Sequence, residues 1–363
     1  MATSTIKPAG GGDYTTLAAW EDWADGQPGP LEEAECYAGG DLGEVTLENW
    51  TPTPRIYVAA GEGHDGTKGS AGAYIDASAA TGIYVHTVDG TQIEGLRIVS
   101  TGQTAIRFFQ CGGKALANLI EHTPSANYQH AIWFHDYGGQ NTTIDAYAQR
   151  NLVYGDESSF RTAGIAAVLY ENAAGEHSTY DVYFDCNTIH GMSEIAHGQA
   201  TGILFMLETG DATATAEIDF KSLQDNVATM AAGSSASCFS KYSVGVGTAT
   251  FTESGTIGNN LSSDGTAESA FTGESNCLVN KSASTQFTAP LTDLNLLSGA
   301  DAKDAGVAIG GIATDAIGNA YATPPSMGAL EYMTTAMGSL GGQARLPGML
   351  RSKRSRTRGG LGG

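Results

Sequence analysis

One short segment type recurs along the chain: a small residue, then Ile, then alternating bulky residues. It occurs as GIYVHT from Gly82, AIRFFQ from Ala105, AIWFHD from Ala131, GIAAVLY from Gly164 and GILFMLE from Gly202. Alternation with a period of two is typical of a β-strand with one buried face. The starting positions are 23, 26, 33 and 38 residues apart, so this strand repeats between loops of variable length.

A second segment type recurs out of phase with the first. It occurs as GLRIVS from Gly95, ANLIEH from Ala117, RNLVYG from Arg150, CNTIHG from Cys186, DNVATM from Asp225 and NNLSSDG from Asn259. Five of these segments align an asparagine: Asn118, Asn151, Asn187, Asn226 and Asn260. Two strand types therefore alternate along the chain.

This alternation predicts an all-β fold, a parallel β-helix whose equivalent strands stack about 4.8 Å apart in successive coils. One inward ladder would be Ile83, Ile106, Ile132, Ile165 and Ile203, with Val85, Phe108, Phe134 and Phe205 lining the same interior. We expect the asparagines at the bends, where their amides hydrogen-bond to neighbouring coils and where Asn accepts left-handed backbone. A β-sandwich with irregular alternation is the alternative fold.

The first fifty residues follow a different pattern. Leu17, Trp20 and Trp23 lie at helical spacing after Thr15 and Thr16, either of which can be the N-cap of a short helix that ends near Ala24. We expect this helix to cover the open first coil, whose edge otherwise offers unpaired backbone.

The two ends of the chain resemble a group of right-handed parallel β-helix proteins of bacteria and tailed bacteriophages. The resemblance lies in GGGDYTTLAAWE (10–21), NNLSSDGTA (259–267), the Asp-Ala-Gly run at 304–306 and MGALEY (327–332). The Ser-Pro that commonly precedes the Asp-Ala-Gly run is absent here. The resemblance implies an N-terminal cap over 1–50, coils over 51–290, a closing segment over 291–332 and a tail over 333–363.

The same resemblance implies a function. Members are structural elements of a virion or cell surface, or spikes that bind or cleave polysaccharide, and many phage members are trimers. We therefore expect a homotrimeric virion structural protein, either a capsid decoration protein or a tail fibre or spike. A carbohydrate-binding or polysaccharide-degrading tail spike is the alternative, and a surface adhesin of bacteria is a third hypothesis.

Charge is distributed unevenly along the chain. The net charge is −21, yet Met333–Gly363 has no acidic residue, so the first 332 residues hold 39 acidic and 12 basic residues. An acidic body argues against nucleic acid or an anionic membrane as partner. We expect the tail to anchor the protein to another virion protein through its six basic residues: Arg345, Arg351, Lys353, Arg354, Arg356 and Arg358.

A sugar-cleaving site would need paired carboxylates in one groove. The acidic candidates are Asp136, Asp156, Glu157, Asp181, Asp185, Glu208 and Asp211. Asp156 and Glu157 follow a strand in a loop, although adjacent side chains point apart. Asp181 and Asp185 are expected to share a face only across a bend. We interpret all of these as solvated acids, so an enzymatic role, as a hydrolase or lyase, rests on the resemblance alone.

The stretch HAIWFHD (130–136) is the most site-like part of the sequence. On a strand, His130, Ile132 and Phe134 share one face, and Trp133 and His135 share the other. Outward Trp133 and His135, with Tyr84 and His86 two coils earlier, form either a sugar-stacking patch or the centre of a subunit interface, and we favour the interface.

The remaining sequence predicts neither a cofactor nor a metal site. Five scattered cysteines without metal-type spacing are expected to be reduced thiols: Cys36, Cys111, Cys186, Cys238 and Cys277. No stretch is long and apolar enough for a membrane span, and the N-terminus lacks the layout of a secretory signal. We therefore expect synthesis in a bacterial cytoplasm and a final location in the virion.

Overall fold

The computed structural model describes residues 2–50, 52–138, 142–156, 162–193, 200–231, 234 and 236–333. The chain divides into two units, Met1–Tyr332 and Met333–Gly363. The basic tail residues lie outside the described residues. No helix in the described part of the chain is long and apolar enough to cross a membrane.

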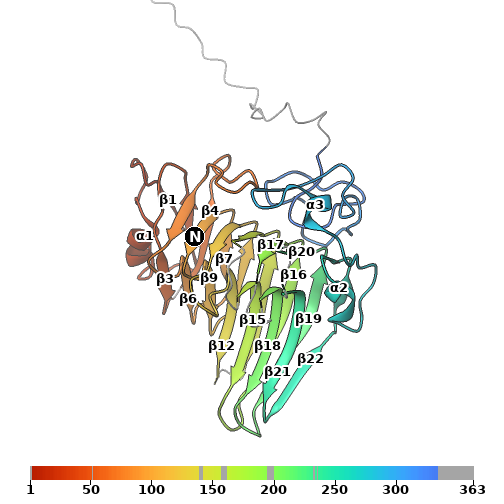
Figure 1. Cartoon of the computed structure of the whole chain (residues 1–363). Coiled ribbons are helices and arrows are strands. Elements are labelled where there is room, and N and C mark those ends of the chain that lie inside the picture. Colours follow the sequence, from red (N-terminus) through yellow and green to blue (C-terminus); the bar gives the residue numbers. More distant parts are fainter. Residues whose placement is uncertain are drawn as a thin grey trace, which may run out of the picture. The chain divides into compact units, whose positions relative to one another are not determined.

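The larger unit is the predicted parallel β-helix, in which each full coil contributes one strand to each of three sheets (Figure 1). Sheet A has ten strands, among which β23 pairs with the second half of β19. They are β1 (Ala2–Ile6), β2 (Leu31–Cys36), β4 (Thr53–Val58), β7 (Thr91–Glu94), β10 (Gly113–Leu116), β13 (Thr143–Gln149), β16 (His177–Asp185), β19 (Thr215–Gln224), β22 (Thr248–Thr252) and β23 (Thr256–Gly258).

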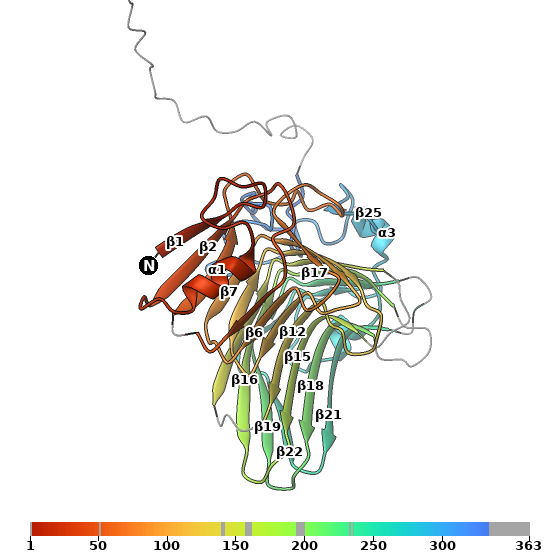
Figure 2. The same cartoon turned by 90° about the vertical axis from the view of Figure 1, so that its left-hand side faces the viewer.

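Sheets B and C have seven strands each. Sheet B contains β5 (Tyr74–Ala77), β8 (Arg97–Thr101), β11 (Leu119–Thr123), β14 (Leu152–Gly155), β17 (Thr188–Met192), β20 (Val227–Met230) and β24 (Leu261–Ser262). Sheet C contains β3 (Val45–Glu48), β6 (Ile83–His86), β9 (Ile106–Phe109), β12 (Ile132–Tyr137), β15 (Ala163–Glu171), β18 (Thr201–Thr209) and β21 (Ser237–Gly245). In the later coils the strands of sheets A and C lengthen together, as Figure 2 shows for β16, β18, β19 and β21.

The predicted isoleucine ladder is confirmed. Each of its five residues is the register partner of the next in sheet C, and all five are fully buried. The ring of Phe134 stacks on that of Phe108 at a centroid distance of 4.8 Å and packs against Phe184 of sheet A. Interior side chains from all three sheets thus form one continuous core along the helix.

The predicted asparagine ladder is also confirmed, at the corner between sheets A and B. The side-chain amide nitrogen of each Asn donates to the Oδ1 atom of the next at 3.0 to 3.2 Å. Each amide also donates to a backbone carbonyl in the coil before it. All five asparagines are buried, so these bonds satisfy polar groups that water cannot reach.

The left-handed residue at this corner is not the ladder asparagine, as the sequence suggested, but the residue before it. These residues have φ between +51° and +60° and are Ala117, Arg150, Cys186, Asp225 and Asn259. Asn259 and Asp225 are of types that tolerate this conformation, whereas Ala117, Arg150 and Cys186 are of types that seldom adopt it. The hydrogen-bonded ladder that follows compensates for that cost.

The helix α1 (Leu17–Ala24) begins after Thr16, whose Oγ1 accepts from the backbone N–H of Ala19 at 3.2 Å, so the predicted cap is confirmed. Leu17 and Trp20 are buried in the core, whereas Trp23 is 39% exposed. Residues 1–50 do more than cover the first coil, because they also supply β1 and β2 to sheet A and β3 to sheet C.

The closing segment runs along the outside of the β-helix. After the short helices α2 (Thr266–Ser269) and α3 (Ala283–Gln286), β25 (Phe287–Ala289) and β26 (Asp293–Leu296) form an antiparallel pair. Apolar side chains of β25 and β26, with Met327, Ala329 and Leu330 near the end of the segment, pack on outward residues of sheet B such as Leu119 and Leu152. Sheet B is therefore buried on both faces from β11 to β24, whereas β5 and β8 keep a partly exposed outer face.

Candidate functional site

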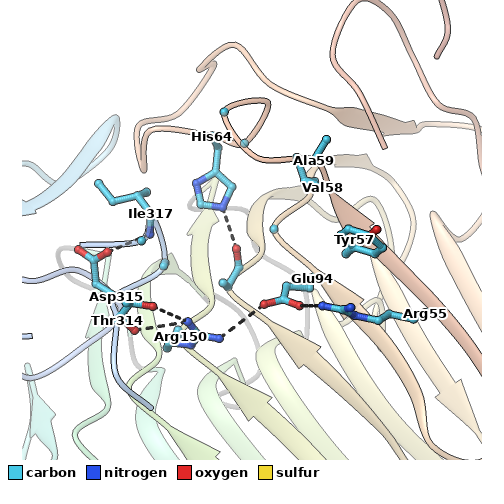
Figure 3. A pocket seen from close by; sticks show the side chains of 16 residues that line it. Arg55, Tyr57, Val58, Ala59, His64, Glu94, Arg150, Thr314, Asp315 and Ile317 are labelled. Carbon is cyan, nitrogen blue, oxygen red and sulfur yellow. Dashed lines mark hydrogen bonds and ion pairs between the residues drawn. The ribbon is translucent and has the colours of Figure 1, made fainter. Parts of the chain in front are cut away.

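An open cleft of about 420 Å³ lies where sheet A turns towards sheet B (Figure 3). One wall is the end of β4 and the loop that carries His64, and the opposite wall is the closing segment around Thr314–Gly318. Glu94 and Arg150 lie between these walls. The return of the closing segment thus creates a concave surface at an otherwise open corner.

Two arginines flank one carboxylate in this cleft. Nη2 of Arg55 donates to Oε2 of Glu94 at 3.0 Å, and its Nη1 donates to Glu33 at 3.1 Å. Nη2 of Arg150 lies 3.9 Å from the other Glu94 oxygen, and its Nη1 forms long hydrogen bonds to Thr314. The guanidinium of Arg55 also lies 4.4 Å from the ring centroid of Tyr57. The cleft therefore combines planar hydrogen-bonding groups of both charges with an aromatic ring.

Two titratable groups of the cleft have structural partners. The Nε2 atom of His64 donates to the carbonyl of Ala117 at 2.8 Å, and burial lowers the pKa of His64, so its ring is neutral. Asp315 is buried and accepts backbone N–H groups of Ile317, Asn319 and Glu331. These contacts hold the two walls in place.

The outer face of sheet A continues from the cleft as a column of polar and aromatic side chains. Successive register partners are Glu33, Arg55, Gln92, Lys114, Tyr147 and Tyr183, which we name the outer strip. The rings of Tyr147 and Tyr183 stack at 4.3 Å, and Nζ of Lys114 lies 4.9 Å from the Tyr147 centroid. A second hollow of about 230 Å³ borders the strip at Lys114, Asp145 and Tyr147.

Three aspartates form a row beside the outer strip. Asp145, Asp181 and Asp219 are register partners in consecutive coils. Nζ of Lys221 lies 2.5 Å from Asp219 and 3.6 Å from Asp181. Burial raises the pKa of Asp181, with repulsion from the other two aspartates and against the attraction of Lys221.

The pKa of Asp219 moves in the opposite direction. Burial raises it, but hydrogen bonds from Lys221 and Ser254 outweigh that effect, and the pKa is lowered. Opposite shifts in neighbouring carboxyls are a feature of acid–base pairs. Here, however, one lysine binds both carboxylates, which is the arrangement of a structural ion-pair network.

The predicted relation between Asp181 and Asp185 was wrong. Both lie on the outer face of the single strand β16, since they are four residues apart and no bend separates them. Asp185 is only 1% exposed and accepts hydrogen bonds from Gln149, Ser222 and the backbone of Gln224. Asp185 is thus a structural acid and not a solvated one, and burial raises its pKa.

The other acidic candidates do not gather at one site. Asp156 is half-buried directly after β14, and Glu157 lies outside the described residues. Asp136 is fully buried inside the β-helix, while Asp211 accepts hydrogen bonds from Thr213 in the turn before β19. Glu208 lies on the outer face of sheet C.

The predicted aromatic patch is assembled on the outer face of sheet C. Tyr84 and Trp133 lie in one column, with Arg107 between them, and His86 and His135 lie in the next, with Phe109 between them. The rings of Trp133 and His135 stack at 4.3 Å. The sequence analysis did not single out Arg107 and Phe109, because an arginine or a phenylalanine in an outward strand position is common.

The sequence analysis also missed the outer strip and two of the three aspartates beside it, Asp145 and Asp219. A signal for them is present: Asp-Ala-Tyr at 145–147, Asp-Val-Tyr at 181–183 and Asp-Phe-Lys at 219–221 repeat an acid and an outward Tyr or Lys. Among the described residues, no group of three or more His, Cys, Asp or Glu side chains is placed to hold a metal ion. The five cysteines are unpaired.

Comparisons of the chain with protein families, with characterised proteins and with solved structures found no match. Inference about its role therefore starts from the surfaces described above.

Proposed function

We propose that this protein is a surface-exposed β-helix of a bacteriophage virion and that it binds polysaccharide along the outer strip of sheet A. The observation that carries the binding role is the continuity of the cleft with the strip. Planar charged groups and tyrosines follow one another over consecutive coils about 4.8 Å apart, a repeat suited to an extended polymer.

The groups on this surface suit a hydroxyl-rich ligand. Carboxylate and guanidinium groups can each exchange two hydrogen bonds with neighbouring hydroxyls, and tyrosine rings offer apolar faces and edges to the ring carbons. The surface includes both Arg55 and Glu94 and so does not select for one sign of charge.

We propose binding rather than cleavage. Of the three aspartates in the row beside the strip, Lys221 binds Asp181 and Asp219, so the row offers no free pair of the kind that sugar cleavage needs. A general acid or base needs an oxygen that is free to exchange a proton with the substrate.

Two features support the virion assignment. The ends of the chain resemble those of phage β-helix proteins, and the basic segment Met333–Gly363 is a unit apart from an acidic body. This division suits a protein whose body faces outward while a separate segment attaches it to a particle.

The binding role is tested by electrophoresis of the full-length protein in native gels that contain bacterial surface polysaccharides. We expect retardation by at least one polysaccharide and no release of reducing ends. Replacement of Lys114 and Tyr147 together by Ala should weaken binding about tenfold or more, since it removes one charged contact and one aromatic contact.

The matched control is Tyr84→Ala, which removes an outward tyrosine from sheet C and should leave retardation unchanged. Circular dichroism confirms that each variant is folded. Retardation that is equal for the wild type and the double variant, or absent with every polysaccharide, would contradict the proposal.

A further inference from the structure

Arg107 lies inside a cage of aromatic rings on the outer face of sheet C. Its guanidinium carbon is 4.4 Å from the ring centroid of Trp133, 4.8 Å from that of Phe109 and 5.4 Å from that of Tyr84. Its Nη2 atom donates to Nδ1 of His135 at 2.8 Å. The cation is therefore fixed in position by its neighbours before any ligand arrives.

This cation has no counter-ion in the part of the chain that is described. Each of the other three arginines described there pairs with a glutamate: Arg55 with Glu33 and Glu94, Arg97 with Glu121, and Arg150 with Glu94. The chain has 39 acidic residues and only 18 basic ones. Arg107 therefore has no carboxylate partner among these residues, although the protein is rich in acids, and it can pair with a carboxylate of another molecule.

The cage also holds hydrogen-bond donors without acceptors. Because Arg107 donates to Nδ1 of His135, the proton of this neutral ring is on Nε2. That Nε2, the indole Nε1 of Trp133 and Nε of Arg107 are buried without a hydrogen-bond partner. Burial lowers the pKa of His135 to about 3, with a smaller effect of the Arg107 charge, so the ring stays neutral near pH 7. All three atoms are donors, and leaving buried donors unsatisfied is costly.

The surroundings of the cage are those of a protein–protein contact. Tyr137 on the same outer face is 55% exposed, and its ring lies 5.7 Å from that of Tyr170 and 6.3 Å from that of His135. Val244, at the end of β21, is 49% exposed. Aromatic residues and arginine are the residue types that dominate the energetics of such contacts.

We propose that the outer face of sheet C is an interface between copies of this chain, in which the guanidinium group of Arg107 receives a carboxylate of a second copy. The complementarity is local, between the unpaired cation of Arg107 and a carboxylate of the second copy, whose first 332 residues carry 39 acidic side chains against 12 basic ones. This contact pairs the isolated cation and covers the exposed rings at once. It involves a different face from the polysaccharide site and does not depend on it.

The test is sedimentation equilibrium of the full-length protein at about 1–100 µM, where a specific interface of ordinary strength is populated. We expect the wild type to associate. Arg107→Gln should lower the association constant at least tenfold, and Arg107→Lys should recover only part of the loss, because Lys offers a single point charge in place of a planar fork. Salt also screens the repulsion between two acidic bodies, so the quantity to follow is the ratio of the association constants of the wild type and Arg107→Gln, which should fall as the salt concentration rises from about 0.05 to 0.5 M.

The matched control is Arg55→Gln, which removes an arginine from the outer face of sheet A and should leave association unchanged. Tyr137→Asp is a second test should Arg107→Gln not fold, since Tyr137 is exposed and a new carboxylate there repels the incoming one. A wild type that stays monomeric at all concentrations overturns the proposal. The proposal is also overturned if folded Arg107→Gln associates as strongly as the wild type. If Arg107→Gln does not fold, equal association of the wild type and Tyr137→Asp overturns it.

Discussion

At the scale of single residues, the most unusual groups are two acids inside the β-helix. Asp136 on β12 and Glu171 on β15 are completely buried, and one oxygen of Asp136 and both of Glu171 have no hydrogen-bond partner. Burial raises the pKa of Asp136 to about 6 and that of Glu171 to about 7, and repulsion between these acids and Glu176 adds to the shift. Both therefore retain protons in the folded protein well above pH 5.

These shifts predict that the contribution of these two acids to stability falls as the pH rises. The ordinary values are 3.8 for Asp and 4.5 for Glu, so between about pH 4 and pH 7 these two positions bind more protons in the folded state than in the unfolded state. Their contribution to stability then falls with increasing pH across this window, by about 1.4 kcal/mol for each unit of pKa shift. The double variant Asp136→Asn, Glu171→Gln cannot ionise at these positions. Urea unfolding should show it to be more stable than the wild type at pH 8 and closer to it at pH 5.

The control for this experiment is Asp211→Asn in the turn before β19. Hydrogen bonds from Thr213 lower the pKa of Asp211, so its replacement should give no gain at pH 8. Asp225 and Glu274 also have pKa values raised to about 7 by burial, so the wild-type protein and the double variant share part of the pH dependence. A double variant that is no more stable than the wild type at pH 8 would show that the two acids are not ionised there or find a partner when charged.

At the scale of elements, the ladders explain how coils that differ in length and sequence stack into one fold. The isoleucine column and the asparagine column each need one residue per coil in a fixed place, while the loops between coils can change in length. Each asparagine links two coils and closes a left-handed corner. Stability therefore depends on neighbouring pairs of coils, as in other repeat proteins.

The asparagine ladder gives a direct prediction. Oδ1 of Asn187 accepts the backbone N–H and the side-chain amide of Asn151, and its own amide donates to Ala148 and Asn226. Asn187→Ala leaves these buried groups unpaired, and at roughly 1–3 kcal/mol for each group we expect a loss of about 3–6 kcal/mol in the free energy of unfolding. Asn172→Ala, in an exposed turn, should change it by less than about 0.5 kcal/mol. Equal losses in the two variants would mean that the ladder bonds contribute nothing beyond those made to water.

The parts of the fold that follow from local alternation were predictable from the sequence. The isoleucines, the asparagine bonds and the Thr16 cap all depend on residues within one or two coils. The position of the closing segment was not, because its packing on sheet B joins residues far apart in the chain, such as Tyr154 and Leu294. The strand LVYG at 152–155 is buried on both faces. Its sequence is an apolar run without alternation, so the sequence does not indicate which face is outward.

The candidate sites were predictable only in part for a related reason. The outward positions of Trp133 and His135 follow from alternation alone. Their assembly with Arg107 depends on register between coils, which loops of unequal length conceal. The strip on sheet A is concealed in the same way, since Lys114, Tyr147 and Tyr183 belong to three different coils.

At the scale of the whole molecule, charge separates the chain into two parts. The first 332 residues carry 39 acidic and 12 basic residues, and the last 31 carry six basic residues and no acidic one. In the virion role that we propose, the basic segment suits an acidic surface on another component of the particle. The sheet A strip and the sheet C face both belong to the unit Met1–Tyr332.

This separation predicts the outcome of a truncation after Tyr332. The unit Met1–Tyr332 contains every strand of the three sheets, so the shortened protein should melt at the same temperature as the full chain and self-associate to the same extent. Particles stripped of this protein should rebind the full chain but not the shortened one, and rebinding should weaken steeply as salt rises from about 0.05 to 0.5 M. A full chain in which the six basic residues are replaced by Gln is the matched control, since it keeps the length of the tail and should also fail to rebind. If the shortened protein rebinds as well as the full chain, attachment belongs to the β-helix itself, and the sheet C face becomes the first surface to test.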